Sequence, residues 1–493
     1  MRIGFDNDKY ITMQAERIRE RIDKFGGKLY LEFGGKLFDD YHASRVLPGF
    51  QPDVKIRMLQ SISDDVEIIV AVNANHIQQG KIRGDYGITY DEDVLRLMDI
   101  FRSMGFAVGG VMVTQYAGQQ LADAFRHRLA NLGITCKLQY PIAGYPNAID
   151  HIVSEEGLGK NEFLETTKPL VVVTAPGPGS GKMATCLSQL YHEHKRGVNA
   201  GYAKYETFPI WNLPLNHPVN IAYEAATADL DDVNMVDPFQ LDAYGEVTVN
   251  YNRDVEIFPV LRSLMTGILG ECPYQSPTDM GVNMAGYGII DDDACCDASR
   301  REIVRRYFRA AVNEKMSGTP SDEVKTLEML MQKADVNANI LPARSAALLK
   351  EEATGKPAGA LELDDGRVIT GRTSTRLGAA SSVLLNSLKA VAGIDDATYI
   401  MSDEVLDPIC DLKSTHLGSK NPRLHSDELL VALALSSANE PLAAKAIESL
   451  KELRGCHAHF SVILSNADVK LYKTLGINVT CEPKYEKHRY FHG

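Results

Sequence analysis

The stretch that decides the fold is residues 168–193, KPLVVVTAPGPGSGKMATCLSQLYHE. A run of buried-strand residues opens into a glycine-rich loop that ends in Gly-Lys, and a helical pattern follows. Backbone N–H groups of such a loop can surround an anion, the next helix presents its positive end, and a lysine adds a mobile charge. The stretch therefore predicts a phosphate-binding loop between a strand and a helix. Its predicted ligand-binding residues are Gly177, Gly179, Ser180, Gly181, Lys182 and Thr185.

The loop departs from the P-loop pattern GxxxxGK[ST] at two positions. Pro176 stands where the pattern has its first glycine, and Met183 replaces the hydroxyl residue that normally reaches Mg²⁺. Thr185 offers a hydroxyl further along the helix, about 200° round the axis from position 183. Three interpretations are compatible with the stretch: a site for ATP and Mg²⁺, a site for phosphate or a phosphorylated metabolite, and a plain turn whose glycines serve backbone angles.

Short apolar segments alternate with amphipathic helical segments from Lys28 to Glu206, which is typical of a parallel sheet covered by helices. In such sheets ligands bind beyond the carboxyl ends of the strands, where the glycine-rich loop falls. We therefore predict an α/β fold, with a Rossmann-like or P-loop-like sheet domain over residues 1–210. The predicted strands are residues 28–33, 66–72, 108–114, 134–140, 170–175 and 200–206, and the predicted helices include residues 93–104 and 119–132.

Two further kinds of sequence follow along the chain. Residues 211–345 are rich in helical patterns, such as 299–313 and 321–334, and predict a mainly helical middle domain. Residues 346–493 alternate helical and strand patterns and predict a C-terminal three-layer α/β module. Its predicted elements are a hairpin around Asp364–Gly366, a helix at 378–392 and strands at 398–402, 460–464 and 477–481.

Composition limits the classes of partner. The chain has 493 residues, and 65 acidic side chains outnumber 52 basic ones, for a net charge of −13. This charge argues against nucleic acid or an anionic membrane as the main partner, and favours a small-molecule ligand. The sequence shows neither a membrane-span run nor a signal core, and its eight cysteines form no CxxC pair, so we expect a cytoplasmic protein with free thiols.

Phosphoryl transfer at the loop would need Mg²⁺ and a polarising cation. Lys204, on the strand after the loop helix, is the candidate cation. Residues 222–239, AYEAATADLDDVNMVDPF, supply carboxylates: Glu224 is a catalytic candidate and Asp229 a metal-ligand candidate. Helix caps and solvated loop residues are the alternative interpretation of these acids. The same stretch also carries Asp231, Asp232 and Asp237.

A polar segment of the C-terminal module, KSTHLGSKNPRLHSDE at 413–428, brings a histidine close to carboxylates. We predict His425 and Glu428 as general acid–base residues, with a helix N-terminus as the alternative. A zinc peptidase is not supported, because Arg196 occupies the second histidine position of an HExxH pattern that would begin at His192.

Residues 200–245, 249–260, 274–283 and 421–428 resemble a bacterial domain-of-unknown-function family, and the resemblance extends over essentially the whole chain. Some members carry the label ATP-dependent peptidase. The resemblance implies a Rossmann-like first part, a helical middle and a C-terminal module similar in topology to cytidine deaminases. The zinc signature of deaminases, HxE with PCxxC, is absent from this sequence, so the topology does not bring deaminase chemistry with it.

Residues 170–204 also resemble the amidoligase branch of P-loop enzymes, the dethiobiotin synthetase and CTP synthase type. That resemblance implies a ligase or kinase that uses ATP to phosphorylate a carboxylate or carbonyl oxygen before nitrogen attacks, although Met183 departs from its pattern. It is the leading functional hypothesis. The alternatives are a nucleotide-independent enzyme that holds a phosphorylated metabolite and uses His425 and Glu428, and a non-catalytic nucleotide or metabolite sensor that acts through homo-oligomer contacts.

Overall fold

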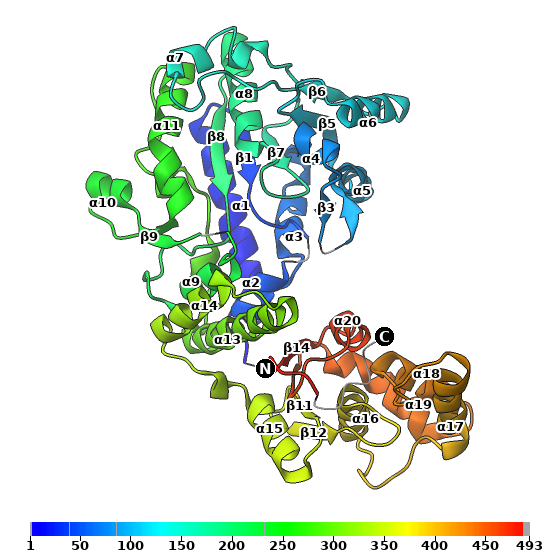
Figure 1. Ribbon diagram of the computed structural model, residues 1–493. Coiled ribbons are helices and arrows are strands. Elements are labelled where there is room, and N and C mark those ends of the chain that lie inside the picture. Colours follow the sequence, from blue (N-terminus) through cyan, green and yellow to red (C-terminus); the bar gives the residue numbers. More distant parts are fainter. Residues whose placement is uncertain (1, 39, 85, 231, 487–493) are drawn as a thin grey trace. The chain divides into compact units, whose positions relative to one another are not determined.

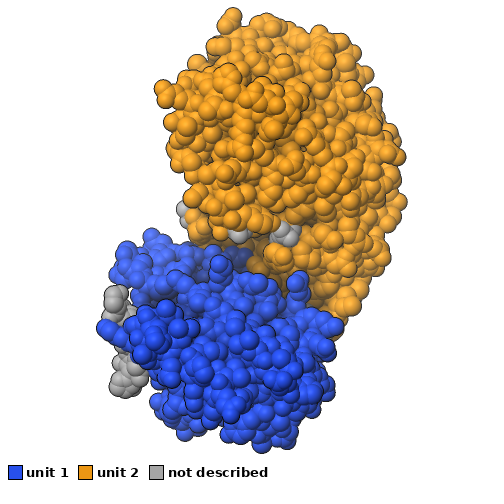
Figure 2. Space-filling model, turned by 90° about the vertical axis from the view of Figure 1, so that its right-hand side faces the viewer, with its two compact units in different colours: residues 1, 300–493 blue, residues 2–299 orange. Residues whose placement is uncertain are grey.

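A computed structural model describes residues 2–38, 40–84, 86–230 and 232–486. The chain forms two compact units, one of residues 2–299 and one that starts at Arg300 (Figure 2). Residues 211–299, which the sequence assigns to a middle domain, belong to the same unit as the first sheet. No helix in the described ranges is long and apolar enough to cross a membrane.

The first unit is built on a six-stranded parallel sheet with the strand order β6-β5-β2-β7-β1-β8 (Figure 1). This sheet confirms the predicted α/β class, because each predicted strand in residues 28–206 is present, with β6 shortened to three residues. Continuous burial explains why they were recognisable: all five residues of both β1 and β7 are buried. The strands are β1 (Leu29–Phe33), β2 (Val66–Asn73), β5 (Ala107–Thr114), β6 (Cys136–Leu138), β7 (Leu170–Thr174) and β8 (Gly201–Tyr205).

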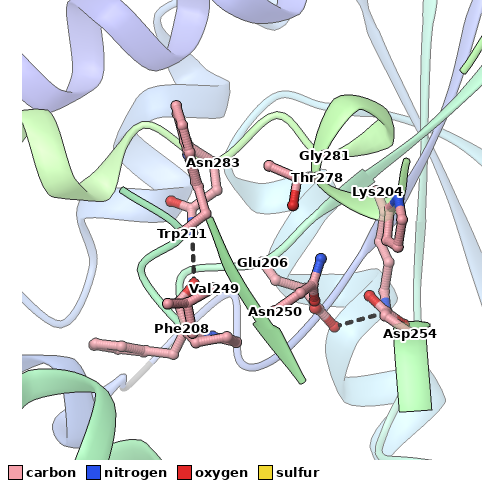
Figure 3. Close-up of a pocket in the computed structure, with 12 residues that line it drawn as sticks. Lys204, Glu206, Phe208, Trp211, Val249, Asn250, Asp254, Thr278, Gly281 and Asn283 are labelled. Carbon is pink, nitrogen blue, oxygen red and sulfur yellow. Dashed lines mark hydrogen bonds and ion pairs between the residues drawn. The ribbon is translucent and has the colours of Figure 1, made fainter. Parts of the chain in front are cut away.

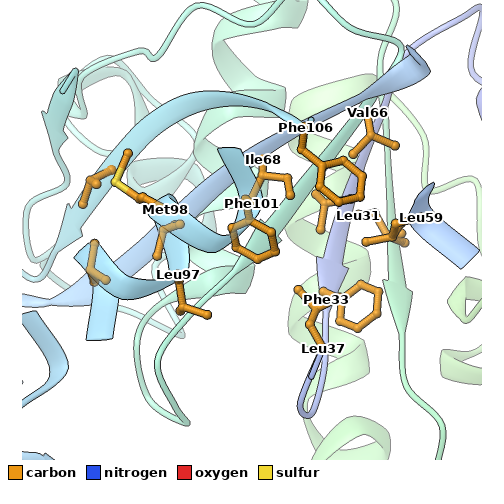
Figure 4. Close-up of a cluster of buried hydrophobic side chains, with 14 of the residues drawn as sticks. Leu31, Phe33, Leu37, Leu59, Val66, Ile68, Leu97, Met98, Phe101 and Phe106 are labelled. Atoms are coloured by element: carbon orange, nitrogen blue, oxygen red, sulfur yellow. The ribbon is translucent and has the colours of Figure 1, made fainter. Parts of the chain in front are cut away.

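Helices cover both faces of this sheet, and alternate residues of each strand face alternate layers. In β1, Leu31 and Phe33 join one core with Ile68, Phe101 and Phe106 (Figure 4), whereas Tyr30 joins the other. The helices whose apolar residues enter the first core are α1 (Asn7–Lys24), α3 (Val54–Gln60), α4 (Ala74–Gln78), α5 (Tyr90–Ser103) and α6 (Gln120–Asn131). Those of the second core are α7 (Ile149–Ile152), α8 (Lys182–Lys195), α11 (Asn252–Leu269) and α12 (Pro277–Met280).

Smaller elements complete the first unit. Two antiparallel strand pairs, β3 with β4 and β9 with β10, lie outside the main sheet. Their bounds are β3 (Ile82–Arg83), β4 (Ile88–Thr89), β9 (Asn234–Val236) and β10 (Val249–Tyr251), and the short helices are α2 (Tyr41–Val46), α4 (Ala74–Gln78), α9 (Pro218–Ala226), α10 (Pro238–Tyr244) and α12 (Pro277–Met280).

The strand order creates a switch point between β2 and β7. After β2 the chain continues to β5 on one side, and after β7 it continues to β8 on the other side, beyond β1. Open parallel sheets bind ligands in the crevice that such a reversal leaves at the carboxyl ends of the strands. The loop of sequence GPGSGK, residues 177–182, comes soon after β7, so it lies at this position.

The second unit holds a four-stranded mixed sheet of order β12-β11-β13-β14. The predicted hairpin is present as β11 and β12, and Gly366 takes the left-handed conformation in its turn. The predicted strand at 398–402 is wrong: Ile400 and Met401 are buried against the core from an irregular segment, while Tyr399 between them and the preceding helix is 92% exposed. Two buried neighbours do not make the alternating pattern of a paired strand.

Helices pack on both sides of this second sheet. Ala343 and Ala347 of α15 pack against Ala360 on one face, and the larger core of the unit covers the other. The strands are β11 (Ala358–Glu362), β12 (Val368–Arg372), β13 (His457–Phe460) and β14 (Asn478–Cys481). The helices that lie in this part of the chain or lead into it are α13 (Asp292–Ser317), α14 (Asp322–Lys333), α15 (Pro342–Thr354), α16 (Ala379–Val391), α17 (Asp403–Asp411), α18 (Ser426–Ser436), α19 (Pro441–Glu448) and α20 (Asn466–Thr474).

Candidate functional site

The carbonyl groups of the GPGSGK loop are held by neighbouring side chains. Asn73, the last residue of β2, donates from Nδ2 to the Gly179 carbonyl (3.0 Å), and Thr114, the last residue of β5, donates to the Ser180 carbonyl (2.8 Å). The Ser180 hydroxyl donates to the Gly177 carbonyl (2.8 Å), and the Gly181 carbonyl accepts from the N–H of Thr185 (2.9 Å). The ends of β2 and β5 thus hold the loop that follows β7.

This arrangement leaves the N–H groups of the loop available. In a trans peptide the N–H points opposite to the carbonyl of the preceding residue, so the N–H groups of Ser180, Gly181 and Lys182 point away from these contacts. None of the three N–H groups has a hydrogen-bond acceptor within the described ranges. Consecutive N–H groups without an acceptor, at the N-terminus of a helix such as α8, are typical of anion-binding loops.

Two loop glycines are required by their surroundings. A side-chain carbon on Gly177 would lie 2.3 Å from the hydroxyl oxygen of Tyr90, closer than any non-bonded contact allows. Gly181 has a φ of +85°, and a carbon there would lie 2.7 Å from the Thr114 hydroxyl. The glycines that the sequence singled out therefore serve both a left-handed turn and a close approach of neighbouring residues.

Basic side chains surround the loop. Lys182 is partly buried, and its ammonium group makes no hydrogen bond or ion pair with the residues that the structure describes. His76 of α4 lies beside Gly179, and its Nδ1 is buried without a hydrogen-bond partner in the described part of the chain. Burial and the nearby charge of Lys81 lower the pKa of His76, so its ring is neutral near pH 7.

Thr185, the predicted alternative hydroxyl for Mg²⁺, is fully buried, and its hydroxyl takes part in the hydrogen bonds that hold the loop in place. Its Oγ1 donates to the Gly181 carbonyl (3.0 Å) and lies 3.2 Å from Oε1 of Gln139. Among the residues that the structure describes, no carboxylate is hydrogen-bonded or ion-paired to residues 176–185. The loop therefore offers hydrogen-bond donors and the charge of Lys182, and in the described ranges none of its residues contacts a carboxylate, the preferred ligand of a hard metal ion.

Lys204, the last residue but one of β8, takes part in a largely buried ion network. Its Nζ lies 2.7 Å from Oδ2 of Asp254, 3.1 Å from Oε1 of Glu206 and 2.6 Å from the hydroxyl of Tyr251. Burial opposes the charge of Lys204, but the carboxylates of Asp254 and Glu206 hold the pKa of Lys204 well above its usual value. Two carboxylates thus already neutralise the lysine that the sequence proposed as a phosphate ligand.

A small cavity of about 40 Å³ adjoins this network (Figure 3). Its lining includes Lys204 and Glu206 together with Trp211, Asn250 and Thr278. Burial and the neighbouring charge of Asp254, only partly offset by Lys204, raise the pKa of Glu206 to about 7. A carboxylic acid that titrates near neutral pH beside a water-sized cavity has the properties of an acid–base group.

The acidic stretch 222–239 serves mainly structural contacts. The carboxylate of Glu224 is buried and accepts the backbone N–H of Asn234 (2.9 Å), while Asp229 is exposed beyond the end of α9. Asp232 pairs with Arg253 (2.6 Å), Asp237 caps α10, and Asp231 lies outside the described residues.

His425 and Glu428 form the N-terminus of α18 in the second unit. The Glu428 carboxylate accepts the N–H of His425 (2.7 Å) and pairs with Lys413 (2.6 Å), which completes a capping box. His425 Nδ1 lies 3.0 Å from Oδ2 of Asp468, and this contact raises the pKa of His425. The interpretation as a helix N-terminus therefore describes both residues.

Sequence patterns did not reveal Asn73, His76, Tyr90, Thr114 or Glu206 as members of these sites. Each is brought in by the strand order or by the folding of a loop, which no local pattern encodes. The one available signal was position, because Asn73 and Thr114 end strands that were predicted correctly.

Comparisons with known proteins match nearly the whole length of the chain. A family model described as domain of unknown function DUF1846, N-terminal, matches residues 3–335, and one described as domain of unknown function DUF1846, C-terminal, matches residues 339–491. The chain is 58% identical over 490 residues, 99% of each chain, to a UPF0371 protein of Corynebacterium diphtheriae. It is 53% identical over 483 residues, 98% of each chain, to a UPF0371 protein of Streptococcus thermophilus. A UPF0371 protein of Streptococcus pneumoniae is 52% identical over 488 residues, 99% of each chain.

Proposed function

We propose that this chain, which belongs to the DUF1846 family, binds the phosphate group of a small-molecule metabolite at the GPGSGK loop. One observation carries the proposal: the carbonyl groups of Gly177, Gly179, Ser180 and Gly181 are engaged, while three consecutive N–H groups have no acceptor in the described ranges. Lys182 adds a charge without an ion-pair partner there. A phosphate offers acceptor oxygens and negative charge to all of these groups.

Binding without Mg²⁺ is the better-supported form of this proposal. Met183 replaces the usual hydroxyl, and the Thr185 hydroxyl already bonds the Gly181 carbonyl. A metal-bound triphosphate also needs carboxylate or hydroxyl ligands, and within the described ranges no carboxylate bonds the loop. The loop's own N–H groups and Lys182 suffice for a phosphate monoester.

ATP-dependent phosphoryl transfer or ligation is the second candidate function. The order of strand, glycine-rich loop, Gly-Lys and helix favours it, as in a P-loop.

Two proposals concern the folds of the units. The order of strand, glycine-rich loop and helix supports the proposal of a Rossmann-like or P-loop-like sheet in the first unit. A hairpin followed by a parallel strand pair supports the proposal of a cytidine-deaminase-like second module. A cytoplasmic location, a homo-oligomer, and catalytic roles for His425 and Glu428 stay predictions.

Calorimetric titration tests the proposal. The full chain is titrated with inorganic phosphate, a sugar phosphate and ATP, each with and without Mg²⁺, and Lys182→Gln is compared with wild type. Lys195→Gln is the matched control, because Lys195 lies at the other end of the same helix. We expect phosphate binding that is indifferent to Mg²⁺, weakened at least about tenfold in Lys182→Gln and unchanged in Lys195→Gln.

Each other outcome decides against part of this proposal. Binding of ATP alone, and only with Mg²⁺, would favour phosphoryl transfer over a metabolite site. Absence of binding for all three ligands, or equal losses in the two lysine variants, would overturn phosphate binding at the loop.

A further inference from the structure

We propose that His217, Asp292 and Cys296 form a binding site for one divalent, borderline-soft metal ion of the zinc type. One donor atom from each of these three side chains lies within 4.8 Å of the other two. None of the three residues belongs to the GPGSGK loop or to the lining of the Lys204 cavity. The site is independent of the proposed phosphate binding.

Helix α9 and the first two turns of α13, all within residues 2–299, position these side chains. His217 is the N-cap residue of α9, and only 9% of its side chain is exposed, so its ring is held firmly. Asp292 and Cys296 lie in the first turns of α13, four residues apart. Residues at this spacing lie on the same face of a helix, so both side chains can reach one ion.

The distances between the donor atoms fit a tetrahedral ion. His217 Nε2 lies 3.0 Å from Oδ1 of Asp292 and 3.5 Å from Sγ of Cys296, and this sulfur lies 3.8 Å from Oδ2 of Asp292. Zinc binds nitrogen and oxygen at about 2.0–2.1 Å and sulfur at about 2.3 Å, which separates tetrahedral ligands by about 3.4–3.6 Å. The two Asp292 contacts use different carboxylate oxygens, so binding through a single oxygen needs a small rotation of this exposed side chain as well as shifts of a few tenths of an ångström.

The chemistry of the three donor atoms determines which metal ion the site prefers. A thiolate and an imidazole favour zinc and its neighbours among the transition metals over Mg²⁺ and Ca²⁺, which prefer oxygen. Three protein ligands leave the fourth tetrahedral position for water or an external ligand, as in zinc sites that are not purely structural. The Asp292 side chain is 59% exposed, so this position is open to solvent.

The adjacent cysteines differ in a way that fits this assignment. Cys295 is fully buried, and its thiol donates to the carbonyl of Gly4 (Sγ to O, 3.5 Å). Cys296 is partly exposed and lies beside the imidazole of His217. Metal binding at Cys296 forms a metal–sulfur bond and releases the thiol proton to solvent.

Metal binding also changes a contact at the start of α9. His217 Nδ1 accepts the N–H of Val219 at 3.3 Å, which is long for a hydrogen bond. A metal bound to Nε2 places the ring proton of neutral imidazole on Nδ1, so this cap contact is given up.

Cobalt titration of the metal-depleted full chain tests the site. Co²⁺ replaces Zn²⁺ in such sites, and a thiolate ligand gives a sulfur-to-cobalt charge-transfer band in the near ultraviolet. We expect this band at a stoichiometry of one ion per chain, its displacement by Zn²⁺, and its loss in Cys296→Ser. Asp292→Asn and His217→Gln should weaken Co²⁺ binding at least about tenfold, while Asp293→Asn, an exposed carboxylate one residue along the same helix, should not.

Two results would overturn the site. One is a wild-type chain without the charge-transfer band, or with a band that Cys296→Ser leaves intact. The other is an equal effect of Asp292→Asn and Asp293→Asn on Co²⁺ affinity. Far-ultraviolet circular dichroism of each variant verifies folding, and a rise of the wild-type Tm with Zn²⁺ that Cys296→Ser abolishes gives a second readout.

Discussion

Replacement of Glu206 by glutamine should make the first unit more stable at neutral pH than wild type. The amide keeps a polar side chain beside Tyr251 and Lys204, but it carries no charge, and Lys204 retains Asp254 as its counter-ion. Wild type, in contrast, buries two carboxylates around a single ammonium group. The excess negative charge is the reason that the variant gains stability.

The magnitude follows from the pKa of Glu206, which burial raises from 4.5 to about 7. Each pKa unit corresponds to about 1.4 kcal/mol, so full ionisation of Glu206 in the folded state costs about 3 kcal/mol. The side chain is 24% exposed, and solvent reduces this to about 2–3 kcal/mol. Because the folded state holds the proton more tightly, wild type loses this free energy of unfolding as the pH rises from 4.5 through 7. The advantage of Glu206→Gln therefore grows over that window and is constant above it.

Fluorescence of Trp211 provides the assay. It is the single tryptophan of the chain and it lines the same cavity as Glu206, so it reports on unfolding of this unit and on the ionisation of Glu206 in the native state. Urea unfolding at several pH values between 4.5 and 8.5 gives the difference in free energy of unfolding between variant and wild type. Glu256→Gln, an exposed carboxylate on α11, is the control for loss of one negative charge.

A difference in free energy that does not change with pH would refute the reasoning. So would a native-state fluorescence transition near pH 7 that persists in Glu206→Gln, because the titrating group would then lie elsewhere.

Two further predictions concern the loop and the second unit. Gly177→Ala should destabilise the first unit by about 1–3 kcal/mol and weaken phosphate binding, because the new carbon would lie 2.3 Å from the Tyr90 hydroxyl. Adding Tyr90→Phe should restore part of the stability, measured by urea unfolding, and part of the phosphate binding, measured by calorimetry. A Gly177→Ala variant with unchanged stability and binding would contradict the close approach. His425→Gln should destabilise the second unit more at pH 6 than at pH 8.5. The pKa of His425 is raised in the folded state, so the stability from its charged contact with Asp468 is fully present below pH 6.5 and is lost as the pH rises through the folded pKa. Hydrogen exchange in α18 measures the effect, and equal losses of stability at both pH values would show that only the helix cap matters.

The first sheet could be predicted from the sequence because its strands are buried on both faces. Short continuous apolar runs, such as residues 170–173 of β7 and 68–72 of β2, are typical of central strands in a parallel sheet, and they are too short for most buried helices. The segment 398–402 failed for the opposite reason: Tyr399 is exposed, and its buried neighbours Ile400 and Met401 enter the core without a partner strand.

The loop of the candidate site could also be predicted, but not its surroundings. Glycine conformations are local, so Gly177 and Gly181 indicate a tight turn by themselves. Thr114 and Tyr90 approach the loop only because β7 lies beside β2 and β5 lies beyond it. The partner of Lys204 is Asp254, 50 residues away, and no spacing rule connects the two.

The place of β7 in the middle of the first sheet constrains the order in which this unit can form. In the described part of the chain β1 pairs only with β7 and β8, although it leaves the ribosome long before either. A nascent chain that ends before residue 170 therefore has no hydrogen-bonding neighbour for β1, whereas β2, β5 and β6 can already associate. The last strand to enter the centre of the sheet is also the one that carries the glycine-rich loop. The phosphate binding that we propose for the loop could therefore begin only after the two halves of the sheet have been joined.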